Sequence, residues 1–202
     1  AFSTWAIAKT ALLIKQAAKT DGLEDKLINA GRWLLRNDNY AVSNQEAASA
    51  DALQTLFLLL GEEKFRSGAN DKINKLLDSW EEKGYFPEYG GFDIGYSSLT
   101  LSCLAHYCKE SGDAGLPLRL KKTIAPLDKN INDEGAYDHS GTSRQTQFLF
   151  PYGFSVFKSP SLAKMKKGLE NNKIINPSWL DDRYMLGLTT DYLLTFLEDF
   201  TC

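Results

Sequence analysis

The sequence predicts an all-α protein. Apolar residues recur at three- and four-residue steps through most of the 202 residues, and glycine follows several of these segments. Strand patterns are nearly absent, since only residues 85–91 and 135–137 have a short extended character. The core is therefore expected to lie between helices.

In the first half of the chain, glycines mark where helices end. The expected helices are, in chain order, residues 5–19, 23–36, 44–60 and 70–83. Ser43 or Asn44 caps the third of them, because a short polar side chain can accept from the free amides of a first turn. Gly22, Gly61 and Gly84 follow three of these helices, where the left-handed backbone of a C-cap suits glycine.

The second half continues the pattern less regularly. The expected helices are residues 94–110, 116–130, 143–156, 161–171 and 181–200. Asp93, Ser161 and Asp181 stand at the start of three of them and are expected to act as caps. Pro151 and Gly153 disturb the helix over residues 143–156, because proline lacks an amide proton and glycine weakens a helix.

These helices form a repeat with a period of roughly 40–50 residues, the range of stacked helical hairpins. In each copy a polar, basic helix ends in an aromatic Gly/Asn-rich loop that leads into a more apolar helix. The helices over residues 53–60, 99–107 and 184–196 are apolar around most of their circumference and need cover on all sides. This favours an α/α toroid, with apolar helices in its inner ring, over an open solenoid.

Residues 1–202 are expected to form one such toroid domain of about four to five hairpins. The first helix has no outer partner, so we expect an incomplete ring, a fragment of a larger chain, or a ring completed by a partner chain or domain.

Composition excludes several classes of function. The net charge of −3, from 23 basic and 26 acidic residues, argues against a dedicated nucleic-acid binder. No apolar run reaches the ~20 residues that a membrane span needs. No phosphate-binding glycine loop and no set of metal ligands indicates a cofactor. Cys103, Cys108 and Cys202 are expected to be free thiols, which favours the cytoplasm unless a leader has been removed for export.

Three loops between outer and inner helices, residues 84–96, 133–144 and 176–184, hold most of the unusual aromatic and charged residues. In a toroid they gather at one mouth. Aromatic faces can stack on sugar rings while charged groups hold hydroxyls or carboxylates. The candidate substrate-binding residues are Tyr85, Glu88, Tyr89, Tyr96, Asp138, Tyr152, Trp179, Asp182 and Arg183. The competing interpretation is that the aromatic residues anchor the loops to the core.

The second of these loops suggests proton transfer. His139 could act as base or charge neutraliser beside a uronate carboxylate, with Tyr137 as proton donor and Arg144 binding the carboxylate. A glycoside hydrolase using Asp93 with Asp138 or Asp182 is the second enzymatic hypothesis. Capping alone would also explain Asp93.

Two stretches carry a resemblance. Residues 87–96 (PEYGGFDIGY), and residues 141–146 (GTSRQT) with 150–154 (FPYGF), resemble uncharacterised bacterial α/α-toroid proteins, which are similar to the helical domains of polysaccharide lyases and related carbohydrate-active enzymes. The resemblance implies a toroid that acts on a polysaccharide, most simply by lyase- or epimerase-type proton abstraction. The alternative is a non-catalytic helical-repeat module that binds a glycan or a protein partner.

Overall fold

The computed structural model describes residues 1–14, 22–180 and 183–200, and it confirms the all-α class. The helices are α1 (Phe2–Ile14), α2 (Leu23–Arg36), α3 (Ser43–Leu60), α4 (Glu63–Lys83), α5 (Ile94–Ser111), α6 (Leu116–Asn130), α7 (Tyr152–Val156), α8 (Ser161–Glu170), the 3₁₀ turn η1 (Pro177–Trp179) and α9 (Arg183–Phe200). Strand-type pairing in these ranges is limited to isolated bridges, which pair Glu88 with Val42 and with Gly91.

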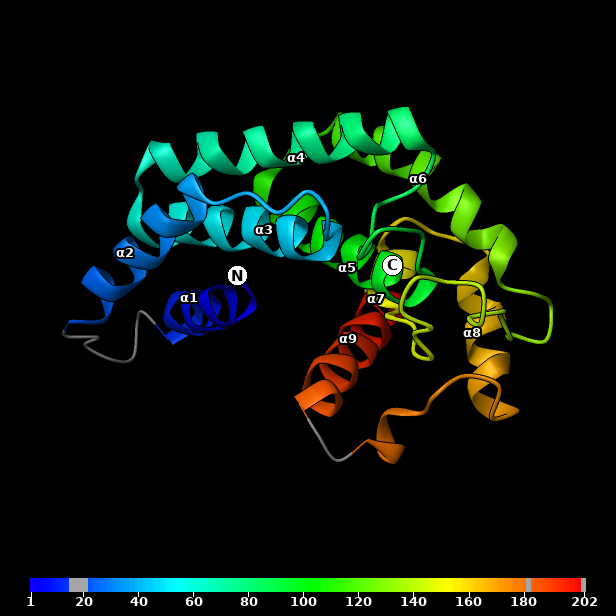
Figure 1. The fold of residues 1–202 in the computed structure, drawn as a ribbon. Helices are drawn as coiled ribbons and strands as arrows, with labels where there is room; N and C mark the ends of the chain where they lie inside the picture. The colour runs from blue at the N-terminus through cyan, green and yellow to red at the C-terminus, as the bar shows by residue number, and fades with distance from the viewer. Residues whose placement is uncertain (15–21, 181–182, 201–202) are drawn as a thin grey trace.

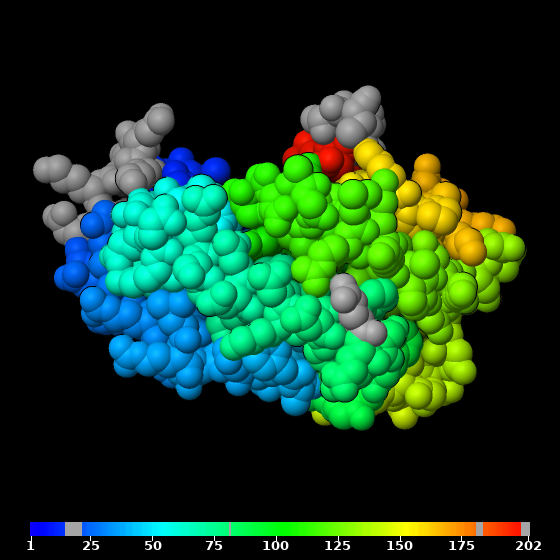
Figure 2. Space-filling model, turned by 90° about the horizontal axis from the view of Figure 1, so that it is seen from above, coloured from blue at the N-terminus to red at the C-terminus, as the bar shows by residue number. Residues whose placement is uncertain are grey.

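The helices form a curved array of two layers (Figure 1). Helices α1, α3, α5, α7 and α9 make an inner row in which each packs on the next, and α2, α4, α6 and α8 lie outside it. Figure 2 shows the outer face, where the colours follow one another from blue to orange because successive hairpins lie side by side. This is the layering that a toroid requires, while closure into a ring stays a prediction.

Helix α3 is the centre of the fold because α1, α2, α4 and α5 all pack against it. Its Leu53 and Leu56, and Leu101 and Leu104 of α5, are fully buried. These leucines belong to two of the three segments whose sequence is apolar around most of the helix circumference, and their burial agrees with the expected need for cover. The third segment, residues 184–196 in α9, lacks this cover, because Leu186, Leu193 and Phe196 are 69%, 59% and 59% exposed.

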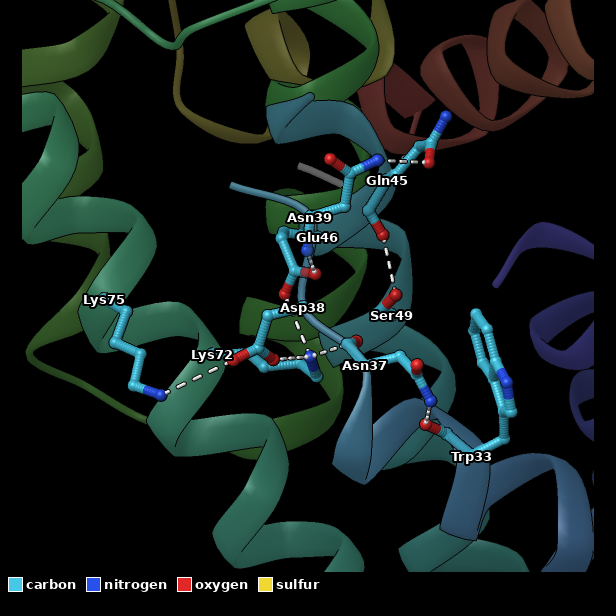
Figure 3. Close-up of polar contacts among 9 residues, drawn as sticks. All are labelled: Trp33, Asn37, Asp38, Asn39, Gln45, Glu46, Ser49, Lys72 and Lys75. Carbon is cyan, nitrogen blue, oxygen red and sulfur yellow. Dashed lines mark hydrogen bonds and ion pairs between the residues drawn. The ribbon is translucent and has the colours of Figure 1, made fainter. Parts of the chain in front are cut away.

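A buried ion cluster joins the first two hairpins (Figure 3). The ammonium of Lys72 on α4 lies 3.0 Å from the carboxylate of Glu46 on α3 and 2.6 Å from that of Asp38 in the loop before α3. It also donates to the carbonyl of Asn37 at 3.2 Å. Lys72 is 4% exposed and Glu46 1%, so each charge depends on its partners.

The expected helix over residues 143–156 is wrong for most of its length, since only Tyr152–Val156 is helical. The backbone amides of Arg144 and Thr146 donate to the carboxylate of Asp93, at 3.0 and 3.3 Å, and Phe150 donates to the Ser98 hydroxyl. These partners from α5 and its N-cap take the donors that a helix would use, so the segment stays irregular up to Pro151.

Some expected caps and bounds also differ. Helix α4 begins seven residues before the expected position, and the predicted extension of the first helix falls on residues 15–21, outside the described ranges. Neither Ser43 nor Asn44 caps α3 with its side chain, and Ser161 does not cap α8. Asp93 does cap α5, accepting from the Tyr96 amide at 3.0 Å, whereas Asp181 lies outside the described residues.

Candidate functional site

The candidate site begins with a short extended segment that crosses the start of two inner helices. Glu88, in this segment, is fully buried. Its carboxylate accepts from the amide of Asn44 at 3.0 Å, the side chain of Asn44 at 2.7 Å and the hydroxyl of Thr100 at 2.7 Å. One carboxylate therefore caps α3 from a distance and ties it to α5.

Burial raises the pKa of Glu88 to about 7. The hydrogen bonds from Thr100 and Asn44 oppose this effect because they favour the charged form, and the nearby charge of Asp93 reinforces it. Glu88 was a candidate ligand contact, but its place beneath the surface makes it a group that positions the loop above.

Asp93 has a similar structural position. It is fully buried, it caps α5, and its second oxygen accepts from the amides of Arg144 and Thr146 and from the Thr142 hydroxyl at 3.1 Å. Four donors thus converge on one carboxylate, and they bring the loop over residues 133–144 against the start of α5.

A row of aromatic side chains lies above these two anchors. The ring centres of Tyr89 and Tyr96 are 5.3 Å apart, those of Tyr96 and Phe148 6.4 Å, and those of Phe148 and Tyr184 5.2 Å. The guanidinium carbon of Arg144 lies 4.7 Å from the Tyr89 ring centre, in cation–π geometry. We call these five residues the aromatic face.

The aromatic face is assembled from separate parts of the chain. Tyr89 belongs to the extended segment, Tyr96 to the first turn of α5, Phe148 to the irregular segment before α7 and Tyr184 to the first turn of α9. Arg144 is exposed and Tyr89 is 39% exposed. Arg144 lies in the irregular segment before α7 and does not begin a helix. The structure thus offers a ligand a row of three half-buried rings that ends in the exposed Tyr89 and Arg144.

The backbone is strained at the end of the aromatic face where Tyr89 and Arg144 stack. Tyr89 has φ of 54° and Gln145, next to Arg144, has φ of 53°. The left-handed region costs a residue with a side chain roughly 1–2 kcal/mol. Tyr89 and Arg144 thus stack where two non-glycine residues hold unfavourable conformations, which is common at functional sites.

Tyr137, His139 and Trp179 gather at a second place. They line a pocket of about 210 Å³ together with Lys173 and residues around it. The Tyr137 and His139 rings meet edge to face with centres 6.1 Å apart, and the Tyr137 hydroxyl donates to the carbonyl of Thr146 at 3.0 Å. Burial raises the pKa of Tyr137 above its ordinary value, so this phenol keeps its proton.

The three residues of the proton-transfer hypothesis are therefore divided between two places. His139 and Tyr137 share the pocket, whereas Arg144 lies over Tyr89 in the aromatic face. Nδ1 of His139 is buried without a hydrogen-bond partner among the described residues.

The other candidates lie apart from the aromatic face. Tyr85 is half-buried edge to face with Phe92. Tyr152 is 5% exposed, and its ring centre lies 4.6 Å from that of His106 in the core. Asp138 is exposed and accepts from the amide and hydroxyl of Ser140 at 2.9 and 2.6 Å. Asp182 and the side chain of Arg183 lie outside the described residues.

Sequence reasoning missed Phe148 and Tyr184 as members of the aromatic face. The expected helix over residues 143–156 conceals Phe148, because the structure places this residue in irregular backbone beside Tyr96. Tyr184 lies only five residues after Trp179 in an aromatic loop, which was the signal that could have found it.

The described residues contain no group of three or more His, Cys, Asp or Glu side chains arranged to hold a metal ion. Among the same residues, no helix has both the length and the apolar character that crossing a bilayer requires. Comparisons of the chain with protein-family models, with curated proteins and with solved structures find no match.

Proposed function

We propose that this protein binds an acidic polysaccharide through the aromatic face, as a helical-repeat module. The observation that carries the proposal is the exposed Arg144 guanidinium stacked on Tyr89 at the end of a row of four rings. Pyranose rings present apolar faces that stack on aromatic side chains, and a guanidinium pairs with a carboxylate through two hydrogen bonds. A polymer of uronic acids offers both features in repeated units.

The hydrogen bonds that hold the backbone beneath the aromatic face support the same proposal. Glu88 and Asp93 fix the backbone under the aromatic face through buried hydrogen bonds from several segments. A face held in place before the ligand arrives loses less entropy on binding. We infer that these carboxylates act as positioning residues, and that Tyr89, Tyr96 and Arg144 contact the sugar.

The test is calorimetric titration with oligomers of a uronic acid, using a neutral glucan oligomer of equal length as comparison. We expect Arg144→Gln to weaken binding of the acidic oligomer about tenfold, the effect of one charge-assisted pair. Tyr89→Ala should weaken both oligomers if the neutral one stacks there. Arg119→Gln, which removes an equal charge from a partly exposed position of the outer helix α6, is the matched control and should leave binding unchanged. Equal losses in Arg144→Gln and Arg119→Gln would contradict the proposal.

A lyase or epimerase activity is the second candidate, favoured by the Tyr137–His139 pair and the buried, unpartnered Nδ1 of His139. His139 would take the proton beside the uronate carboxylate and Tyr137 would donate one to the leaving oxygen. The same mixtures of protein and uronic acid oligomer distinguish a lyase from a binding module. An unsaturated uronate product that absorbs ultraviolet light, lost in His139→Gln while binding persists, would establish the lyase. If the oligomers bind but stay intact, the protein is a binding module without lyase activity. If no oligomer binds, a protein becomes the favoured partner of the aromatic face.

A further inference from the structure

A separate pocket of about 260 Å³ lies between the inner helices, lined from α1, α3, α5 and α9. Its walls are mostly apolar. The large apolar side chains that line it are Phe2, Trp5, Leu99, Phe150, Leu186 and Leu194. Typical sites for drug-sized ligands measure roughly 300–1,000 Å³, so this pocket suits a smaller molecule.

Asp51 lies in this apolar wall. It is 2% exposed, and its Oδ1 has no hydrogen-bond partner among the described residues. An unpaired buried carboxylate is costly, and native structures retain few of them. The neighbouring Asp191 differs, because it accepts from the Ser102 hydroxyl and, at 2.7 Å, from the Tyr152 amide. Asp51 is therefore the carboxylate in this pocket that has capacity for a ligand.

The charges around the pocket define which ligand fits. Two carboxyl groups, Asp51 and Asp191, line it, and burial raises the pKa of both, that of Asp51 well above its ordinary value. Asp51 therefore holds a proton in the free protein, and pairing with an ammonium group releases that proton to solution. His106 is the one lining residue in the described chain that could become cationic, and burial lowers its pKa to about 4, so it is neutral at pH 7. An anionic ligand would meet no cationic side chain among the described lining residues, and the nearby Lys9, whose charge acts on Asp51, is already paired with Glu110. A cationic head group would meet the free oxygen of Asp51 and the rings of Trp5 and Phe2, which attract cations.

We propose that this pocket binds a small apolar primary amine, with the ammonium group at Asp51 and the hydrocarbon part between α1 and α9. The carboxyl group of Asp51 accepts from the ammonium. Leu186 and Leu194 of α9 and Leu99 of α5 pack against the hydrocarbon, which loses its contact with water. This site is distinct from the aromatic face, and its test does not depend on polysaccharide binding.

The experiment compares three probes with the same chain length, hexylammonium, 1-hexanol and hexanoate, by calorimetry and by NMR titration of the whole protein at pH 7. We expect hexylammonium to bind at least about tenfold more tightly than hexanol, and hexanoate to bind least. Asp51→Asn should weaken hexylammonium about tenfold and leave hexanol nearly unchanged. Asp25→Asn, at an exposed position of α2, makes the same change of side chain and should have no effect.

A second variant locates the site independently of Asp51. Gly187 lines the pocket, and a Cβ there would meet no atom within 4 Å, so Gly187→Leu fills open space inside a helix that leucine favours. It should abolish binding of both hexylammonium and hexanol. Equal affinity for all three probes, preference for hexanoate, no binding of any probe, or unchanged hexylammonium binding in both Asp51→Asn and Gly187→Leu would each overturn the proposal.

Discussion

Lys72→Met should destabilise the protein by about 3–5 kcal/mol, the usual effect of removing one partner from a buried ion pair. The substitution keeps the apolar stem but removes the ammonium that Glu46, Asp38 and the Asn37 carbonyl share (Figure 3). Glu46 is 1% exposed and would lose its counter-charge. Urea unfolding followed by circular dichroism at pH 7 measures the change.

Two further variants identify the cause. Lys75 also faces Asp38, at 3.7 Å, but its side chain is 60% exposed, so Lys75→Met should cost less than about 1 kcal/mol. The double variant Lys72→Met/Glu46→Leu removes both buried charges and should recover much of the lost stability. Similar losses in Lys72→Met and Lys75→Met would show that the buried cluster has no special role.

The second large effect concerns pH and Glu88. Its pKa of about 7 in the folded protein lies above the ordinary value of 4.5, so the folded state holds a proton that the unfolded chain releases between these two values. Stability therefore falls as pH rises from about 4.5 to about 7. At 1.36 kcal/mol per pH unit the contribution of this one group is about 3 kcal/mol.

The measurement is the difference in unfolding free energy between the native chain and Glu88→Gln across this pH range. Asp191, whose pKa burial also raises to about 7, contributes to both proteins and cancels in the difference. Glutamine keeps an acceptor for the Asn44 amide and the Thr100 hydroxyl but cannot ionise. The native chain should lose about 3 kcal/mol relative to the variant between pH 4.5 and 7.5. A pH-independent difference, like that expected for exposed Glu24→Gln, would contradict this account.

Local signals in the sequence were sufficient for much of the fold. Residues 23–36 and 116–130 form helices with the predicted bounds, and Gly61 and Gly84 end α3 and α4 with left-handed backbones. The apolar pattern of α3 and α5 also predicted their place in the inner row. In these cases the residues near in sequence determine the conformation.

Where prediction failed, a partner distant in sequence had replaced a local one. Glu88 takes the capping role expected of Ser43 or Asn44, from 44 residues along the chain. Asp93 takes the amides of Arg144 and Thr146 and so prevents the expected helix there. Tyr89 and Arg144 were both candidates, but their stacking depends on these distant bonds and could not be read from spacing.

The two-layer array has a consequence for how the protein opens. Because each inner helix packs mainly on its neighbours in the row, the array resembles a one-dimensional stack, in which local opening starts at the ends. Helix α3, with four neighbours, belongs to the most protected part, while α1 and α9 stand at the two ends of the row. A small molecule held between α1 and α9 would join these ends. Its binding energy would then stabilise both ends of the row against local opening. Amide exchange would slow more in the terminal helices than in the core.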